Sequence, residues 1–102
     1  MNDMSDIDNG VMHTTPANGN VFADLGFQPQ EAAKLKIKSQ LMMQISEWVK
    51  TSNLKQEEAA ELLHVNRPRV SDLMTGKIEK STIDSLVDML ERTGRHVTVN
   101  VA

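Results

Sequence analysis

Cysteine is absent from the 102 residues of this sequence, which excludes disulfide bonds and thiolate metal sites. Aromatic residues are scarce as well, with one tryptophan, two phenylalanines and no tyrosine. No run of about 18 apolar residues is present, and the N-terminus is acidic, so we expect neither a membrane span nor a secretory leader. A chain this short holds at most one domain and leaves little room for a catalytic cleft. We therefore expect a small cytoplasmic protein.

Acidic charge is concentrated at the N-terminal end of the chain. The formal net charge is −3, yet residues 1–31 contain five of the 14 acidic residues and no lysine or arginine. The rest of the chain therefore carries 11 basic and nine acidic side chains, a formal charge of +2. Basic residues gather at Arg67, Arg69, Lys77 and Lys80. Because phosphate binding depends on such a local patch, the negative net charge does not exclude a nucleic-acid partner.

The middle of the sequence predicts two short helices joined by a tight turn. The first helix covers about residues 56–63, and the second begins near Arg67 and ends at Gly76, which can adopt a positive φ. Asn66 can cap the second helix, and Pro68 lies in its first turn, where a missing N–H is tolerated. Helices this short do not form alone in water, so we expect them to pack on neighbouring helices.

The spacing within this helix pair resembles the helix-turn-helix of the phage-repressor-like, xenobiotic-response-element (XRE) class, in the order Gln56, Ala60, Val65, Val70, Ser71. Three segments are similar to HigA-type antitoxins: NVFADLGF at 20–27, KQEEAAELL at 55–63 and NRPRVSDL at 66–73. The resemblance covers about residues 18–102. It implies a mostly α fold, a four- to five-helix phage-repressor-like helix-turn-helix domain at residues 30–93, with a C-terminal β-strand that pairs in a dimer.

Residues at the start of the second helix are the main candidates for DNA contact. In a helix-turn-helix, this end faces the base edges of the major groove. An arginine can donate two hydrogen bonds to guanine, which favours Arg67, while Arg69 could contact a base or a phosphate. Asp72 could accept from cytosine or orient an arginine. In all, we expect DNA contacts from Gln56, Asn66, Arg67, Pro68, Arg69, Ser71, Asp72, Thr75 and Lys77.

Two residues depart from the pattern of the family. Lys55 occupies the position where threonine or serine usually begins the first helix, so we expect a weaker cap there. His64 occupies a turn position where glycine is common, and it must adopt a left-handed conformation. His13 and His96 have no metal-ligand spacing to each other or to His64, and we expect no metal and no cofactor. Since no paired nucleophile and base or phosphate loop is present either, we expect no enzyme.

The segments before the helix pair differ in character. Residues 1–18 are polar without an apolar period, and we expect a disordered arm. Residues 19–29 hold an apolar cluster that could pack on the helical core or form a docking segment for a partner protein, namely Val21, Phe22, Leu25 and Phe27. A long helix at about residues 30–51 is predicted from one apolar stripe, Leu35, Met42, Ile45 and Val49, flanked by Leu41 and Trp48.

The C-terminal part predicts one more helix and a strand. Residues 77–80 form a loop, and Ser81 is a good N-cap for a helix that ends at Thr93-Gly94. The dimerisation strand, at residues 94–102, alternates β-branched and polar residues: His96, Val97, Thr98, Val99, Asn100 and Val101. This strand has no mate elsewhere in the chain, and the simplest mate is the same strand of a second copy, antiparallel across a two-fold axis. We therefore expect a homodimer.

The resemblance implies a transcriptional repressor that binds an inverted-repeat operator in double-stranded DNA. As the antitoxin of a type II toxin–antitoxin pair, it would repress its own operon, be nucleoid-associated when bound to DNA, and neutralise a RelE/HigB-like ribonuclease toxin. A stand-alone phage-repressor-like regulator without a toxin partner is the alternative. A pure protein-interaction module is a third interpretation, which the two arginines at the start of the second helix disfavour.

Overall fold

The computed structural model describes residues 19–102, and the predicted arm at residues 1–18 lies outside them. The chain divides into two units, residues 1–33 and 34–102, which are described separately. Its elements are, in order, α1 (Val21–Asp24), α2 (Pro29–Thr51), α3 (Gln56–Leu63), α4 (Arg67–Met74), the 3₁₀ turn η1 (Ile78–Lys80) and α5 (Ile83–Arg92). The mostly helical fold class is thus confirmed. Over residues 19–102, no helix is long and apolar enough to cross a membrane.

The first unit contains α1 and the beginning of α2. Asn20 holds this region together, because its Oδ1 accepts the N–H of Phe22 at 3.0 Å and its Nδ2 donates to the carbonyl of Ala32 at 2.8 Å. The rings of Phe22 and Phe27 meet edge to face, with centroids 6.1 Å apart. The sequence indicated an apolar cluster here but not the helix α1, since four residues are too few to show a helical period.

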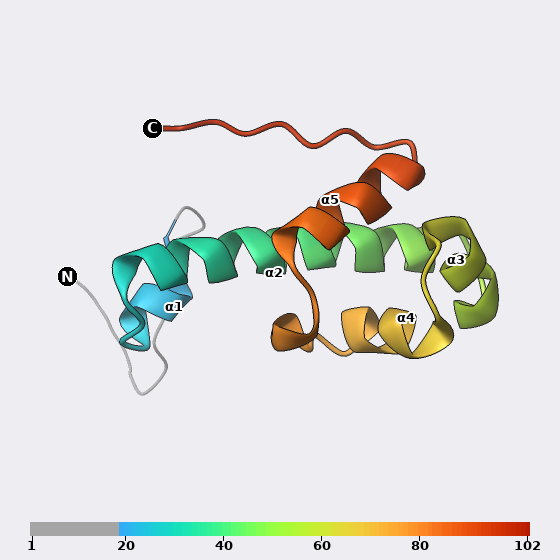
Figure 1. Ribbon diagram of the computed structural model, residues 1–102, viewed down its shortest axis with the longest axis horizontal. Coiled ribbons are helices and arrows are strands. Elements are labelled where there is room, and N and C mark those ends of the chain that lie inside the picture. The colour runs from blue at the N-terminus through green and yellow to red at the C-terminus, as the bar shows by residue number, and fades with distance from the viewer. Residues whose placement is uncertain (1–18) are drawn as a thin grey trace. The chain divides into compact units, whose positions relative to one another are not determined.

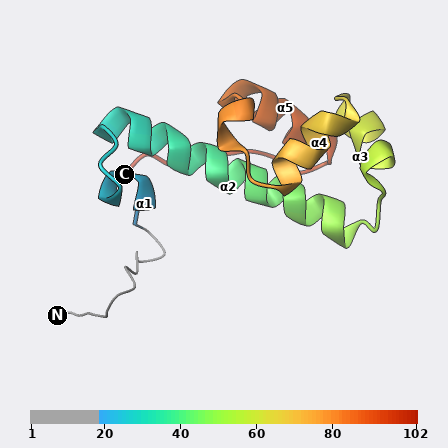
Figure 2. The same ribbon diagram turned by 90° about the horizontal axis from the view of Figure 1, so that it is seen from below.

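The long helix α2 begins at Pro29, one residue before the predicted start, because proline is well suited to the first helical position. Its buried apolar residues in the second unit are Leu41, Met42, Ile45 and Val49. Leu35 was predicted on the same stripe and is only half-buried. The reason is visible in Figure 1 and Figure 2, where α3, α4 and α5 gather around the C-terminal half of α2.

The core of the second unit is built from all four of its α-helices. The residues with an exposed fraction below 2% include Ile45 of α2, Leu63 of α3, Val70 of α4, and Leu86 and Met89 of α5. Each of the two short helices α3 and α4 thus contributes at least one fully buried side chain. Burial of this kind, rather than intrinsic propensity, is what holds helices of eight residues in place.

The start of α5 corrects one prediction. Thr82, not Ser81, is the N-cap: its hydroxyl accepts the N–H of Ser85 at 3.2 Å, and the N–H of Thr82 donates to the Ser85 hydroxyl at 3.3 Å. Ser81 is instead 4% exposed, and its Oγ has no hydrogen-bond partner among the described residues. Packing therefore takes Ser81 into the core and leaves the capping role to the neighbouring hydroxyl. The predicted loop at residues 77–80 contains the short turn η1.

The chain after α5 runs as an extended segment (Figure 1). No strand is formed within residues 19–102, because a ladder requires a second strand and this segment has none in its own chain. The predicted C-terminal strand and its pairing in a dimer therefore remain predictions.

Candidate nucleic-acid interface

Helix α4 is held in place by a cap at its N-terminus and by the burial of one face. At its N-terminus, the Oδ1 of Asn66 accepts the N–H of Arg69 at 3.0 Å, as the sequence predicted for a capping asparagine. On its inner face, Val70 and Leu73 are 0% and 2% exposed. Because these two residues lie three positions apart, the opposite face of the helix points away from the core. Pro68 lies in the first turn, where it removes no intrahelical hydrogen bond.

The outward face carries the predicted contact residues in two degrees of exposure. The exposed members are Asn66, Arg67, Pro68, Thr75 and Lys77, and the half-buried members are Gln56, Arg69, Ser71 and Asp72. Arg67 is therefore free to extend into solvent, whereas Arg69 is partly covered by the rest of the protein. The structure places eight of these residues on or next to α4 and Gln56 at the first position of α3.

Two residues at the C-terminal end of α4 are already engaged. The hydroxyl of Thr75 donates to the carbonyl of Ser71 at 2.8 Å, so it must rotate before it can donate to a phosphate. Asp72 lies 3.8 Å from the Nζ of Lys77. This ion pair was not predicted from the sequence, and the side chain of Lys77 remains 56% exposed in it. The two roles expected for Asp72, base contact or orientation of an arginine, stay predictions.

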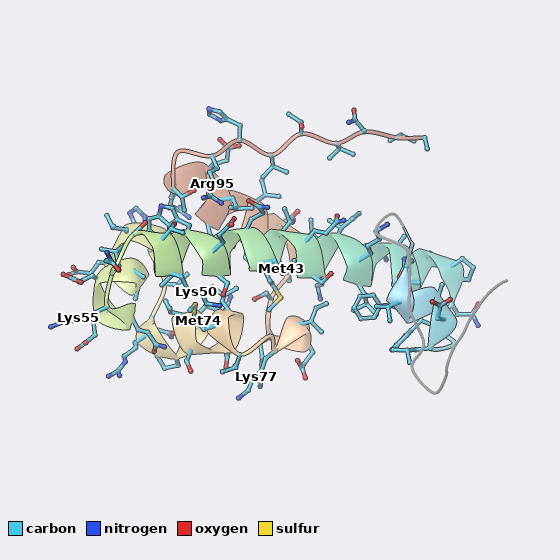
Figure 3. All side chains as sticks on the ribbon, turned by 180° about the vertical axis from the view of Figure 1, so that it is seen from behind. Met43, Lys50, Lys55, Met74, Lys77 and Arg95 are labelled. Atoms are coloured by element: carbon cyan, nitrogen blue, oxygen red, sulfur yellow. The ribbon has the colours of Figure 1, made fainter. Side chains whose placement is uncertain are left out.

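The N-terminus of α3 lacks a side-chain cap, as predicted. The ammonium group of Lys55 has no lone pair and cannot accept an N–H. Only the reverse contact forms, in which the Glu58 carboxylate accepts the N–H of Lys55 at 2.9 Å. The first N–H groups of α3 consequently remain available to an external acceptor. In Figure 3, Lys55 and Lys77 lie on either side of α4. The sequence predicts Lys55 only as a weak helix cap. Its positive charge, directly before Gln56, is the signal that could have identified it as a further candidate DNA contact.

The turn between α3 and α4 has the predicted left-handed residue. His64 has φ 60° and ψ 41°. Its N–H donates to the carbonyl of Glu61 at 3.2 Å, and the N–H of Val65 donates to the carbonyl of Ala60 at 3.0 Å. These two bonds close α3 and turn the chain into α4. Histidine therefore adopts the conformation for which glycine is usual, and it does so on the surface of the protein.

A protein-family model described as "Helix-turn-helix domain" matches residues 21–102. The chain belongs to this helix-turn-helix family. A solved structure, described as a candidate XRE-family transcriptional regulator, is similar with a TM-score of 0.66 and 25% sequence identity, over 71% of this chain and 81% of that chain. No curated protein matches the chain. The family match and the structural neighbour together support a DNA-binding transcriptional regulator with an XRE-type helix-turn-helix, which confirms that part of the prediction.

The other predicted sites of this helix-turn-helix protein are largely exposed. In the first unit, Val21, Leu25 and Phe27 expose 44%, 69% and 46% of their surface, and Phe22 is half-buried. In the C-terminal segment, Val97 is half-buried and packs on the core cluster. The remaining residues of the predicted dimerisation strand are exposed: His96, Thr98, Val99, Asn100 and Val101. Residues 19–102 contain no group of three or more His, Asp or Glu side chains that could hold a metal ion.

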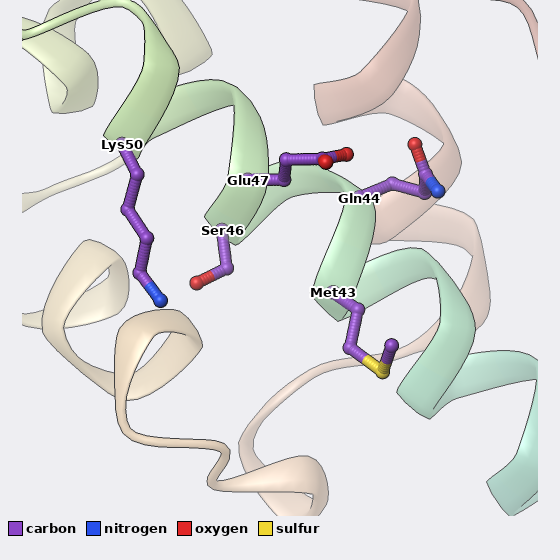
Figure 4. A pocket seen from close by; sticks show the side chains of 5 residues that line it. All are labelled: Met43, Gln44, Ser46, Glu47 and Lys50. Atoms are coloured by element: carbon purple, nitrogen blue, oxygen red, sulfur yellow. The ribbon is translucent and has the colours of Figure 1, made fainter.

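One surface hollow had no counterpart in the sequence analysis. It has a volume of about 380 Å³ and is lined by five residues of α2, Met43, Gln44, Ser46, Glu47 and Lys50 (Figure 4). The hydroxyl of Ser46 contacts the sulfur of Met74 in α4 at 3.3 Å. The lining of the hollow combines one thioether with amide, hydroxyl, carboxylate and ammonium groups. All five lining residues belong to α2, so the hollow is separate from the outward face of α4.

Proposed function

We propose that this protein is a sequence-specific transcriptional repressor that recognises DNA with the N-terminal half of α4. The observation that carries the proposal is the pairing of a buried and an exposed face on one capped helix. Val70 and Leu73 are buried, while Arg67 extends from the first position into solvent. An eight-residue helix held in this way presents its polar side chains at a fixed angle, as major-groove recognition requires.

The roles of the individual residues follow from their exposure. Arg67 is the candidate for bidentate contact with guanine, because it is the exposed arginine nearest the start of the helix. Arg69 is half-buried and would contact a base or hold a phosphate. The uncapped N-terminus of α3, with Gln56 and Lys55, suits a DNA phosphate, because free N–H groups, the helix dipole and an ammonium group all attract an anion there.

The proposed repressor acts as a homodimer on an inverted-repeat operator. Two recognition helices separated by about 34 Å, one turn of DNA, can enter successive major grooves on one face of the duplex. The exposed C-terminal segment, with Val99 and Val101 at 78% and 91% exposure, supports pairing between two copies. A dimer also doubles the phosphate contacts, which a protein of formal charge −3 needs for tight binding.

We further propose that the protein is the antitoxin of a toxin–antitoxin pair. Support comes from the sequence resemblance to HigA-type antitoxins and from the exposed apolar segment at residues 19–29, where Leu25 is 69% exposed. Such a segment suits the apolar surface of a protein partner, here a RelE/HigB-like toxin. The alternative is a stand-alone regulator, which the description of the structural neighbour favours, since it names transcriptional regulation alone.

The DNA-binding proposal is tested by a matched pair of charge-removing variants. Arg67→Ala should weaken binding to the DNA upstream of the protein's own gene by about 1–3 kcal/mol and leave binding to random DNA nearly unchanged. Lys34→Ala removes the same charge from an exposed site on α2, away from α4, and should bind the upstream DNA like the parent. Equal binding by Arg67→Ala and the parent would show that α4 is not the recognition helix.

The antitoxin proposal is tested by co-expression with the product of a neighbouring gene for a small basic protein. We expect the two proteins to co-purify and Leu25→Glu to release the partner, because a carboxylate would be buried in an apolar contact. The control is operator binding by Leu25→Glu, which should match the parent. Failure of the parent to retain the neighbouring protein would favour the stand-alone regulator.

A further inference from the structure

The C-terminal end of α4 is closed by two backbone hydrogen bonds that reach back past Thr75. The N–H of Gly76 donates to the carbonyl of Leu73 at 3.4 Å. The N–H of Lys77 donates to the carbonyl of Asp72 at 3.0 Å. Gly76 has φ 75°, the left-handed conformation that this closure, a Schellman motif, requires. The closure fixes the backbone of Lys77 beside the last turn of α4.

The side chain of Lys77 returns to the same residue that its backbone contacts. Its Nζ lies 3.8 Å from a carboxylate oxygen of Asp72, whose side chain is 24% exposed. The lysine side chain remains 56% exposed and lies beside α4 (Figure 3). Because the backbone of Lys77 is already fixed against Asp72, the ion pair only has to order the side chains. Asp72 is therefore the residue that directs this ammonium group.

The carboxylate of Asp72 lies on the outward face of α4. Residues three and four positions apart share a helical face, so Asp72 shares its face with Pro68 and Thr75, which are both exposed. The buried residues Val70 and Leu73 lie on a different side of the helix. Asp72 is the one acidic residue of α4. The face that is expected to meet DNA thus carries a single negative group among its polar and basic residues.

An acidic group at this place opposes DNA binding unless the duplex offers it a hydrogen-bond donor. Duplex DNA carries one negative charge for about every 1.7 Å of its axis, which repels a carboxylate. The Nζ of Lys77 can bind a phosphate only by leaving Asp72, and the carboxylate then faces the DNA unpaired. The amino group of a cytosine in the major groove can donate to this carboxylate and offset the loss. Random sequences place such a donor there only by chance.

We propose that Asp72 is a specificity-determining residue, which holds Lys77 away from phosphates on DNA without the matching base and so lowers the affinity for random sequences. The proposal rests on the recognition of DNA by α4 that is proposed above. Specificity is a difference between two affinities, and weakening the wrong complex raises it as effectively as strengthening the right one. Arg67 provides attraction to the correct base, and Asp72 provides repulsion from incorrect sequences.

Asp72→Asn tests the proposal, because it removes the charge and nearly preserves the size of the side chain. At low salt, this variant should bind random DNA about two- to fivefold more tightly than the parent, in line with the strength of exposed ion pairs. Its affinity should also fall more steeply with salt, by about 0.9 in the log–log slope for each Lys77 that binds a phosphate. Affinity for the DNA upstream of the protein's own gene should rise less or fall, so the ratio of the two affinities should decrease.

Two controls separate this role from a change in total charge. Asp88→Asn removes the same charge from an exposed position of α5, on a different side of α2 from α4 (Figure 1), and should bind both DNAs like the parent. In a Lys77→Ala background, Asp72→Asn should leave the salt dependence unchanged, because the lysine through which Asp72 acts has been removed.

The outcomes distinguish this inference from the DNA-binding proposal. If Asp72→Asn and Asp88→Asn bind random DNA with the same affinity and salt dependence, Asp72 has no such role, and recognition by α4 stands. An equal change in salt dependence with and without Lys77 would overturn the action through this lysine. Failure of the parent to bind its upstream DNA, or equal binding by Arg67→Ala, would overturn recognition by α4 and this inference with it.

Discussion

The substitution His64→Gly should stabilise the protein, although it removes a side chain from the turn of the helix-turn-helix. His64 has φ 60° and ψ 41°, and a left-handed conformation costs an L-residue about 1–2 kcal/mol. Glycine adopts it freely but loses about 0.5–1 kcal/mol through its more flexible unfolded chain. The imidazole is exposed, so little packing is lost. The net gain should be about 0.5–1 kcal/mol, or roughly 2–8 °C in melting temperature for a domain of this size.

Asn53 provides the matched control, because it has φ 55° at the end of α2 and is also exposed. Asparagine tolerates the left-handed region better than most residues, so Asn53→Gly should gain less than His64→Gly or lose stability. Both variants are compared with the parent by thermal and urea unfolding. A His64→Gly variant that is less stable than the parent, or no more stable than Asn53→Gly, would refute the strain assigned to this turn.

Three further predictions concern the core, the start of α5 and the contacts of Glu91 near the end of α5. Leu63→Ala should cost about 2–5 kcal/mol in urea unfolding, because this side chain is 0% exposed. Thr82→Ala should lower the free energy of unfolding by about 1 kcal/mol through loss of the cap. Ser81→Ala should be neutral or stabilising, because it removes an unsatisfied buried hydroxyl. A larger loss of stability in Ser81→Ala than in Thr82→Ala would identify Ser81 as the cap. The hydrogen bond from the N–H of Val97 lowers the pKa of Glu91 in the folded protein below its ordinary value of 4.5, so its ionised carboxylate stabilises the fold above pH 4.5, and this stabilisation is lost as the pH falls through the folded-state pKa. Glu91→Gln should therefore show a smaller difference in the free energy of unfolding between about pH 7 and about pH 3 than the parent does.

Local signals in the sequence were sufficient for the helix-turn-helix. Asn66 and Pro68 mark the start of α4 by their chemistry alone, and the apolar residues Val70 and Leu73 define its buried face. The left-handed turn at His64 was expected from the resemblance to the family, in which glycine is common at this position. These features depend on neighbours within one or two helical turns, which is the range that a sequence pattern can report.

The choice of cap for α5 could not be predicted in the same way. Ser81 and Thr82 are adjacent hydroxyl residues, and either can cap a helix. Packing against the core decides between them, because it buries Ser81 to 4% exposure and leaves Thr82 at the surface. A difference that depends on tertiary burial has no local signature.

Contacts between distant parts of the chain also could not be predicted from the sequence. The pairing of Arg95 with Gln44 joins residues 51 positions apart, and only the arrangement of α2 and α5 brings them together. The ion pair between Asp72 and Lys77 crosses the end of α4, where helical spacing no longer applies. For the C-terminal strand, the alternating pattern indicates the type of element but not its mate, which requires a second chain.

Titration of isotope-labelled protein with the DNA upstream of its own gene tests the central claim most directly. The account predicts that the largest changes in backbone amide shifts occur from Asn66 to Asp72 and at Gln56, where α4 and the N-terminus of α3 would meet the duplex. Arg67→Ala should reduce these changes at equal DNA concentration. Tight binding with the amides of α4 unshifted, and with the changes confined to other elements, would contradict recognition by this helix.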